Sequence, residues 1–234
     1  GSLVERTSDN IFKELFDKED STYGLDDILA SIKKAKENDD IKGIYIQATS
    51  LNANFASLQE IRDALDDFKK SGKFIVAYSD NYTQGMYYLS SVANKVLLNP
   101  KGAIEWRGLA SQPLFLKGLL EKLGIEMQVF RVGTYKAAVE RFSATEMSPA
   151  NREQVTAYIT SIWNEIITDV AASRKISVDS LNNYANRMLM FYPAEQTVKS
   201  GMADTLIYKN DVRDYLKQLA KIDKDDNLAV LGLD

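Results

Sequence analysis

The chain has 234 residues, of which 45% are hydrophobic and 26% are charged, and its formal net charge is −4. This length and composition are typical of a globular protein with one large domain or two small ones. The acidic balance and the lack of a basic run argue against a nucleic-acid footprint, so we expect no nucleic-acid partner.

The sequence holds neither Cys nor His. Thiolate chemistry, disulfides and the Ser-His-Asp and Cys-His mechanisms are therefore excluded. Histidine is also the commonest transition-metal ligand, and the carboxylates show no EF-hand spacing, so we expect no metal and no cofactor. Acid–base chemistry near neutral pH would need a lysine or a carboxylate whose pKa is shifted.

Alternating helices and strands are predicted in the first half of the chain. Residues 1–20 are polar and mixed, and we interpret them as an N-terminal arm. The apolar spacing then predicts a helix over 25–38, a strand over 41–47, a helix capped by Ser57 that ends at Gly72, and a buried strand over 74–78. Further elements are predicted at 84–92 (helix), 96–98 (strand), 103–106 (strand), 115–123 (helix) and 125–132 (strand). This order favours an α/β fold with parallel strands joined by right-handed crossovers.

Helices dominate the prediction after residue 148. Ser148 is placed to cap a long helix that runs to about residue 173. We interpret the apolar stripe of this helix as core or subunit packing rather than as a cofactor site. Shorter helices are predicted at 177–188, at 193–198 and from Asn210, as cap, to 220. Residues 221–234 begin as a charged linker and end apolar, which would suit the first strand of a second half.

The segment Arg131-Val132-Gly133-Thr134-Tyr135-Lys136 is a candidate site. Gly133 ends the predicted strand, and Lys136 follows among small and apolar residues. Loss of water lowers the pKa of a lysine amine from about 10.4 toward neutrality. A neutral amine can act as a general base. The residues alone leave open the simpler interpretation of a solvated surface charge.

Two motifs resemble the signal peptide peptidase A family, also called protease IV. One is Val132-Gly133-Thr134-Tyr135-Lys136, followed by Ala138-Val139-Glu140 and Met147-Ser148-Pro149. The other is Asn81-Tyr82-Thr83-Gln84-Gly85-Met86-Tyr87-Tyr88-Leu89, followed by Ala93-Asn94-Lys95. The likeness covers about residues 21–219 and fits the first half of the family's long, two-half form. It implies one domain over 21–220 with a crotonase-like, ClpP-like spiral of βαβ units and C-terminal helices, and a short strand at 204–208.

The resemblance also assigns the chemistry, with Lys136 as the general base of a Ser/Lys dyad. Such a dyad needs a serine nucleophile and an oxyanion hole. The family's serine lies in the second half, and the corresponding position here holds Gln84, with Met86 in the place of a glycine. Because an amide is no nucleophile, we expect the isolated chain to be inactive. We reject Ser90, Ser91 and Ser143 as nucleophiles from their positions in the chain, and we interpret Glu140 as a local hydrogen-bond or ion-pair partner.

Partners and location follow from the same resemblance. It implies a membrane-anchored homo-oligomer on the outer or periplasmic side of the cytoplasmic membrane, which degrades cleaved, hydrophobic signal peptides. The C-terminal half of the same chain is the further partner. No segment here approaches the ~20 apolar residues of a membrane span, so we expect the anchor elsewhere. Two alternatives stay open, a non-catalytic scaffold half and a crotonase-type acyl-CoA enzyme, although the latter needs a carboxylate pair that does not stand out.

Overall fold

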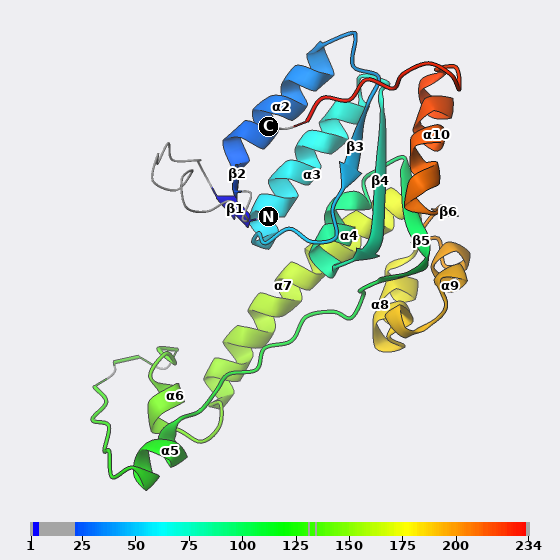
Figure 1. Ribbon diagram of the computed structural model, residues 1–234. Coiled ribbons are helices and arrows are strands. Elements are labelled where there is room, and N and C mark those ends of the chain that lie inside the picture. The colour runs from blue at the N-terminus through cyan, green and yellow to red at the C-terminus, as the bar shows by residue number, and fades with distance from the viewer. Residues whose placement is uncertain (1, 5–21, 131, 134, 233–234) are drawn as a thin grey trace. The chain divides into compact units, whose positions relative to one another are not determined.

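The computed structural model describes residues 2–4, 22–130, 132–133 and 135–232 (Figure 1). The chain forms two compact units. The first is built from Gly1–Arg107 and Ile167–Asp234, and the second from Gly108–Ile166.

A four-stranded parallel sheet forms the centre of the first unit. Its order is β3-β4-β5-β6, with β3 at Gly43–Gln47, β4 at Phe74–Tyr82, β5 at Lys95–Ile104 and β6 at Thr205–Leu206. Four consecutive residues of β4, from Ile75 to Tyr78, are at most 1% exposed. A strand buried on both faces is typical of a parallel sheet that helices cover on each side.

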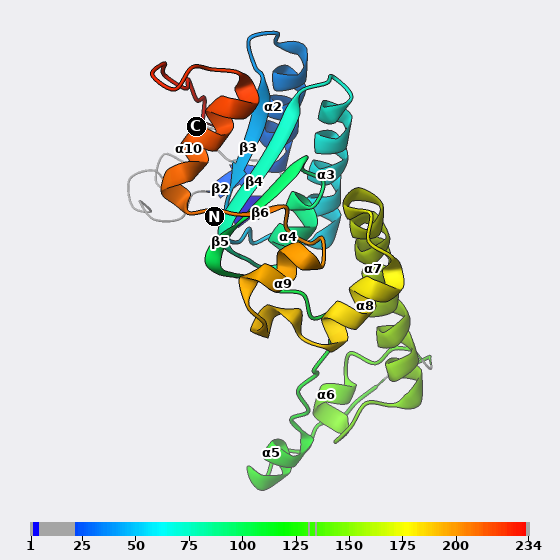
Figure 2. The ribbon, with the colours of Figure 1, turned by 90° about the vertical axis from the view of Figure 1, so that its right-hand side faces the viewer.

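Helices cover both faces of this sheet. Figure 1 shows α2 (Leu25–Glu37) and α3 (Phe55–Lys69) on one side and α10 (Lys209–Ala220) on the other, and Figure 2 shows the same layers turned by 90°. The inward stripe of α3 repeats at helical spacing, and its members are at most 3% exposed: Leu58, Ile61, Leu65 and Phe68. On the opposite face, Val212 and Leu216 of α10 join a cluster with Val76, Tyr78 and Leu97.

Shorter elements complete the first unit. The helix α4 (Gln84–Ser90) connects β4 to β5, and α8 (Val178–Asn186), the 3-10 helix η1 (Leu189–Phe191) and α9 (Ala194–Lys199) precede β6. Two short strands, β1 (Ser2–Val4) and β2 (Thr22–Gly24), pair in parallel with each other. No helix within the described residues is both long and apolar enough to cross a bilayer.

The second unit contains α5 (Lys117–Lys122), α6 (Glu140–Ser143) and the first part of α7 (Pro149–Arg174). The N–H of Leu116 donates to the carbonyl of Arg141 at 2.6 Å, which ties the start of α5 to α6. The apolar stripe of α7 is partly exposed at Val155, Ile159 and Ile162. It is fully buried only toward the C-terminal end of the helix, at Ile166, Ile167 and Val170.

The predicted helices and strands are largely confirmed, but two predicted caps are wrong. Asn54, not Ser57, caps α3, because its Oδ1 accepts the N–H of Ser57 at 2.8 Å. Tyr208, not Asn210, is the cap residue of α10, and it forms no side-chain cap hydrogen bond. The cap lies three residues earlier than predicted in α3 and two residues earlier in α10.

The two strands predicted on either side of Asn99-Pro100 are one continuous strand, β5. Leu98 pairs with Ser79 and Ala103 pairs with Asn81, so the register between β4 and β5 shifts at this point. The shift places 99–102 in a bulge, where a proline without an N–H is tolerated.

The strand predicted over 125–132 is wrong for the residues that the structure describes. Residues 125–130 and 132 form neither strand nor helix, and Ile125, Phe130 and Val132 are 47%, 92% and 86% exposed. A strand needs a neighbour to pair its N–H and C=O groups, and the second unit supplies none to these residues. Residues 227–232 form no strand either, and most of the predicted N-terminal arm, at 5–20, lies outside the described residues.

Candidate functional site

Gln84 occupies the first position of α4, where the resemblance places the family's serine. Thr83 caps this helix, and its Oγ1 accepts the N–H of Met86 at 3.4 Å. The side chain of Gln84 is 8% exposed, and its Oε1 accepts the N–H of Arg107 at 3.0 Å. Its own N–H donates to Glu105 Oε2 at 3.4 Å. Gln84 therefore joins α4 to the segment that follows β5, and it offers an amide where a peptidase would need a hydroxyl.

None of the three serines near the motifs is placed as a nucleophile. Ser90 and Ser91 are fully buried. Ser91 Oγ donates to the carbonyl of Tyr88 at 2.8 Å, and Ser90 Oγ has no hydrogen-bond partner among the described residues. Ser143 closes α6, with its Oγ donating to the carbonyl of Val139 at 3.1 Å. The structure therefore agrees with the rejection of all three from the sequence.

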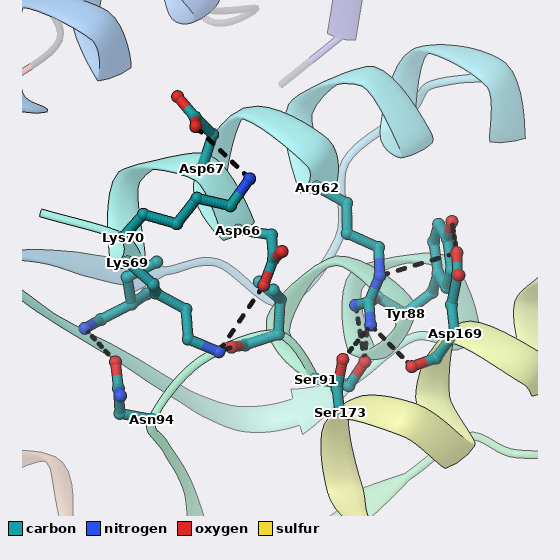
Figure 3. A network of polar contacts seen from close by, with 12 residues as sticks. Arg62, Asp66, Asp67, Lys69, Lys70, Tyr88, Ser91, Asn94, Asp169 and Ser173 are labelled. Atoms are coloured by element: carbon teal, nitrogen blue, oxygen red, sulfur yellow. Dashed lines mark hydrogen bonds and ion pairs between the residues drawn. The ribbon is translucent and has the colours of Figure 1, made fainter.

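A buried arginine holds α4 in place (Figure 3). Arg62 is 4% exposed and lies on α3. Its Nη1 donates to the carbonyl of Tyr88 at 2.5 Å and to Ser91 Oγ at 2.8 Å. Its Nη2 donates to the carbonyl of Asp169 at 3.0 Å and to Ser173 Oγ at 2.5 Å. One guanidinium thus connects α3, α4 and the C-terminal part of α7.

Charge complementarity completes this network. Arg62 Nε lies 3.7 Å from Asp169 Oδ2, and the Tyr88 hydroxyl donates to the same oxygen at 2.6 Å. Burial lowers the pKa of Arg62, whereas its interactions with Tyr88 and Asp169 oppose that change. Burial, followed by the hydrogen bond to Asp169, raises the pKa of Tyr88. The phenol therefore remains a neutral hydrogen-bond donor at physiological pH.

Arg62 was not among the residues predicted from the sequence, although the sequence carries a signal for it. Arg62 lies four residues after Leu58 and three before Leu65, so all three share the buried face of α3. A single cation on an otherwise apolar helical face predicts a buried charge with dedicated partners.

Lys136 lies in a turn of the second unit, and its side chain is exposed. Its N–H is 3.5 Å from the carbonyl of Gly133, whose φ of +107° belongs to the region that favours glycine. The sequence interpretation required burial of the amine, and the described residues do not provide it. Three large apolar or aromatic side chains close to Lys136 in the chain are exposed, with Phe130, Val132 and Tyr135 at 92%, 86% and 53% exposure.

Glu140 follows Lys136 by four residues and is 4% exposed. Its Oε1 accepts the hydroxyl of Ser148 at 2.5 Å, and its Oε2 accepts the side-chain amide of Asn151 at 3.0 Å. The predicted role of Glu140 as a hydrogen-bond partner is therefore confirmed. Ser148 also caps α7, as predicted, because its Oγ accepts the N–H of Asn151 at 3.2 Å.

The two motifs thus fall in separate units, Gln84 in the first and Lys136 in the second. Within the described part of the chain, no group of His, Cys, Asp or Glu side chains is arranged to hold a metal ion.

Comparison with protein families decides the classification. The model of peptidase family S49 matches residues 67–223, which is more than half of the chain and includes both motifs. The chain belongs to peptidase family S49. Its parallel α/β architecture agrees with the crotonase-like, ClpP-like fold of S49 peptidases, as the resemblance implied. Membership in S49 also supports a peptidase rather than the acyl-CoA enzyme considered from the sequence.

Curated relatives of this S49 chain include proteases from bacteria and a plant. It is 38% identical over 207 residues to Protease 4 of Salmonella typhi, which is 86% of this chain and 32% of the relative. It is 35% identical over 164 residues to Protease 4 of Haemophilus influenzae, which is 70% of this chain and 27% of the relative. It is 29% identical over 232 residues to the chloroplastic serine protease SPPA of Arabidopsis thaliana, which is 99% of this chain and 34% of the relative. The chain thus spans about a third of the length of these relatives.

Proposed function

We propose that this chain is the base-supplying first half of an S49 serine peptidase, in which Lys136 acts as the general base for a serine in the second half of the same protein. The observation that carries the proposal is Gln84. The position that corresponds to the nucleophile holds a side-chain amide whose oxygen accepts the N–H of Arg107, while the backbone N–H of Gln84 donates to Glu105. The chain therefore offers a base motif without a nucleophile, and a complete dyad needs a serine from elsewhere.

The exposed apolar side chains near Lys136 support the proposal that another part of the protein covers this surface. Phe130 and Val132 expose most of their side chains to water, and exposed apolar clusters commonly mark interaction surfaces. Covering them would also exclude water from the nearby amine, and dehydration favours the neutral form of an amine. The second half is the occupant that this proposal requires, because it would bring the serine to Lys136.

The substrates and the cellular setting are part of the same proposal. The proposed substrates are cleaved signal peptides, which are short and hydrophobic. The proposed setting is the outer or periplasmic side of the cytoplasmic membrane, where the protein works as a membrane-anchored homo-oligomer. The support is the likeness of both sequence motifs to the signal peptide peptidase A family. An apolar groove would suit such peptides.

The test is hydrolysis of a hydrophobic fluorogenic peptide by the full-length protein. Lys136→Ala should lower kcat by several orders of magnitude, because the members of a catalytic dyad act as a unit. Lys136→Arg should fail as well, since a guanidinium stays protonated and cannot accept a proton. Lys122→Arg is the matched control, because Lys122 is another exposed lysine of the second unit.

Thermal unfolding of each variant separates lost chemistry from lost folding. Substantial hydrolysis by a well-folded Lys136→Arg protein would remove Lys136 from the mechanism. In that event the chain would be the non-catalytic scaffold half that the sequence left as an alternative.

A further inference from the structure

We infer that Glu140 is a positioning residue for Lys136, and that it acts by fixing the turn that carries the lysine onto the first turn of α7. This inference rests on the function proposed above for Lys136. It assigns Glu140 no contact with substrate and no proton transfer.

The carboxylate of Glu140 is held by several donors at once. Ser148 donates its hydroxyl to Oε1 at 2.5 Å and its backbone N–H to Oε2 at 3.2 Å. Asn151 donates its side-chain amide to Oε2 at 3.0 Å. A carboxylate that is 4% exposed is stable only with such partners, so its position is tightly determined.

These donors belong to the N-terminus of a long helix. Ser148 caps α7, and its carbonyl accepts the N–H of Arg152 at 2.9 Å, which begins the helical pattern. The first turn of a helix carries N–H groups without helical partners and a partial positive charge, and both favour a nearby carboxylate. Glu140 therefore binds the start of a 26-residue helix rather than a loop.

Backbone hydrogen bonds connect Glu140 to the segment that carries Lys136. The N–H of Glu140 donates to the carbonyl of Ala137 at 2.9 Å, and the N–H of Ala137 donates to the carbonyl of Tyr135 at 3.1 Å. These two bonds connect the backbone of Glu140, through Ala137, to the segment that carries Lys136. A second contact lies on the other side of the lysine, where the hydroxyl of Tyr135 reaches Glu153 Oε2 of α7 at 3.5 Å.

The backbone of Lys136 is thus bracketed by two attachments to α7, a strong one through Glu140 and a weak, exposed one through Tyr135. A general base must lie within hydrogen-bond reach of the group that it deprotonates. A misplacement of about 1 Å can cost about a hundredfold in rate. A buried carboxylate that fixes the turn provides such precision, even though the lysine side chain itself is exposed.

The experiment compares Glu140→Gln and Glu140→Ala in the full-length protein, with Lys136→Ala as the reference. Asn54→Ala is the matched control, because it removes a helix cap that belongs to the first unit, whereas the lysine turn belongs to the second. We expect Glu140→Ala to lower kcat about a hundredfold with KM changed less than about twofold. Glu140→Gln should retain part of the rate, because its amide keeps one acceptor oxygen for Ser148 or Asn151. Asn54→Ala should leave both constants unchanged.

Amide hydrogen exchange on the same proteins provides a readout that does not depend on activity. Exchange at 135–144 should rise in Glu140→Ala and not in Asn54→Ala. A wild-type kcat in Glu140→Ala, or unchanged exchange at 135–144, would overturn the positioning role while the inactivity of Lys136→Ala left the proposed function intact. An active Lys136→Ala protein would instead overturn the proposed function, and with it the role of Glu140.

Discussion

The hydroxyl of Tyr88 donates to Asp169 Oδ2 at 2.6 Å, and this bond joins α4 to the C-terminal part of α7. The same carboxylate lies 3.7 Å from the buried guanidinium of Arg62. An exposed pair, Lys36 and Asp67, is closer at 2.6 Å. Distance alone would rank the exposed pair higher, but water screens it, whereas the buried group loses its hydration and depends on its protein partners.

Arg62→Ala should therefore strongly destabilise the first unit. The substitution leaves the carbonyl of Tyr88, the hydroxyl of Ser91 and the carboxylate of Asp169 without their buried donor. Removing one partner of a buried charged network typically costs about 3–5 kcal/mol. Urea unfolding followed by circular dichroism would measure the loss. Lys36→Ala is the control and should leave the midpoint almost unchanged, and equal losses in both variants would contradict the burial argument.

Gly102→Ala should also destabilise the fold, for a steric reason. A Cβ at Gly102 would lie 1.9 Å from the carbonyl oxygen of Asp80, where the register of β4 and β5 shifts. The strands would have to separate, and overpacking of this kind costs about 1–3 kcal/mol or more. Gly118→Ala is the matched control, because a Cβ there meets nothing within 4 Å.

The control should gain stability, since Ala is favoured over Gly inside a helix by about 0.5–1 kcal/mol. Thermal unfolding would show opposite shifts of Tm for the two substitutions. A stable Gly102→Ala protein would mean that β4 and β5 do not approach as closely as the structure shows.

Stability should depend on pH through Asp80 and its partner Tyr78. The Tyr78 hydroxyl and the Asn99 amide both donate to Asp80 Oδ1 at 2.7 Å, and the Tyr78 hydrogen bond is the main cause that lowers the pKa of Asp80. A lowered folded-state pKa stabilises the fold above the unfolded value near 3.8, and this contribution disappears as the pH falls below it. Asp80→Asn should therefore reduce the loss of folding stability as the pH falls.

At alkaline pH the dependence has the opposite sign, because stability falls as the pH rises. Burial raises the pKa of Tyr78 to about 12, from an unfolded value of 10.0. The stabilisation is complete below pH 10 and is lost as the pH rises toward 12. Tyr78→Phe should reduce this alkaline loss. Urea midpoints measured from pH 3 to pH 11 would check both limbs, and identical profiles for the wild type and both variants would refute the linkage.

Much of the first unit could be predicted from the sequence, because its signals are local. The spacing of Leu58, Ile61, Leu65 and Phe68 predicts the buried face of α3, and the structure has that face. The buried run at 74–78 likewise becomes the core of β4. The exact caps could not be predicted, because Asn54 and Ser57 are both good cap residues and the tertiary packing selects between them.

The second unit was less predictable, for two physical reasons. The β-branched and aromatic residues at 125–132 predict a strand, but propensity cannot show whether a neighbouring strand exists to pair with it. The burial of Lys136 depends in the same way on residues far away in the chain or on another chain. Glu140 was predictable as a hydrogen-bond partner, whereas its donors at Ser148 and Asn151 follow from the return of the chain to the start of α7.

Self-association is the last prediction, and it concerns the exposed apolar residues before Lys136. Phe130 and Val132 are 92% and 86% exposed, and burying such a side chain contributes about 1.5–3 kcal/mol. We expect the isolated chain to associate in sedimentation velocity runs as its concentration rises. The double substitution Phe130→Ser and Val132→Ser should weaken this association on the order of a hundredfold, since about 3 kcal/mol is lost.

Phe191→Ser is the control, because Phe191 is 75% exposed but belongs to the first unit. If both variants associate like the wild type, the surface near Lys136 is not the contact between copies. A wild-type chain that stays a monomer at high concentration would show that this surface does not join copies of the isolated chain. The proposed second half would then be its remaining candidate partner, and adding that half in the same experiment should shift the sedimentation of the wild type but not of the double variant.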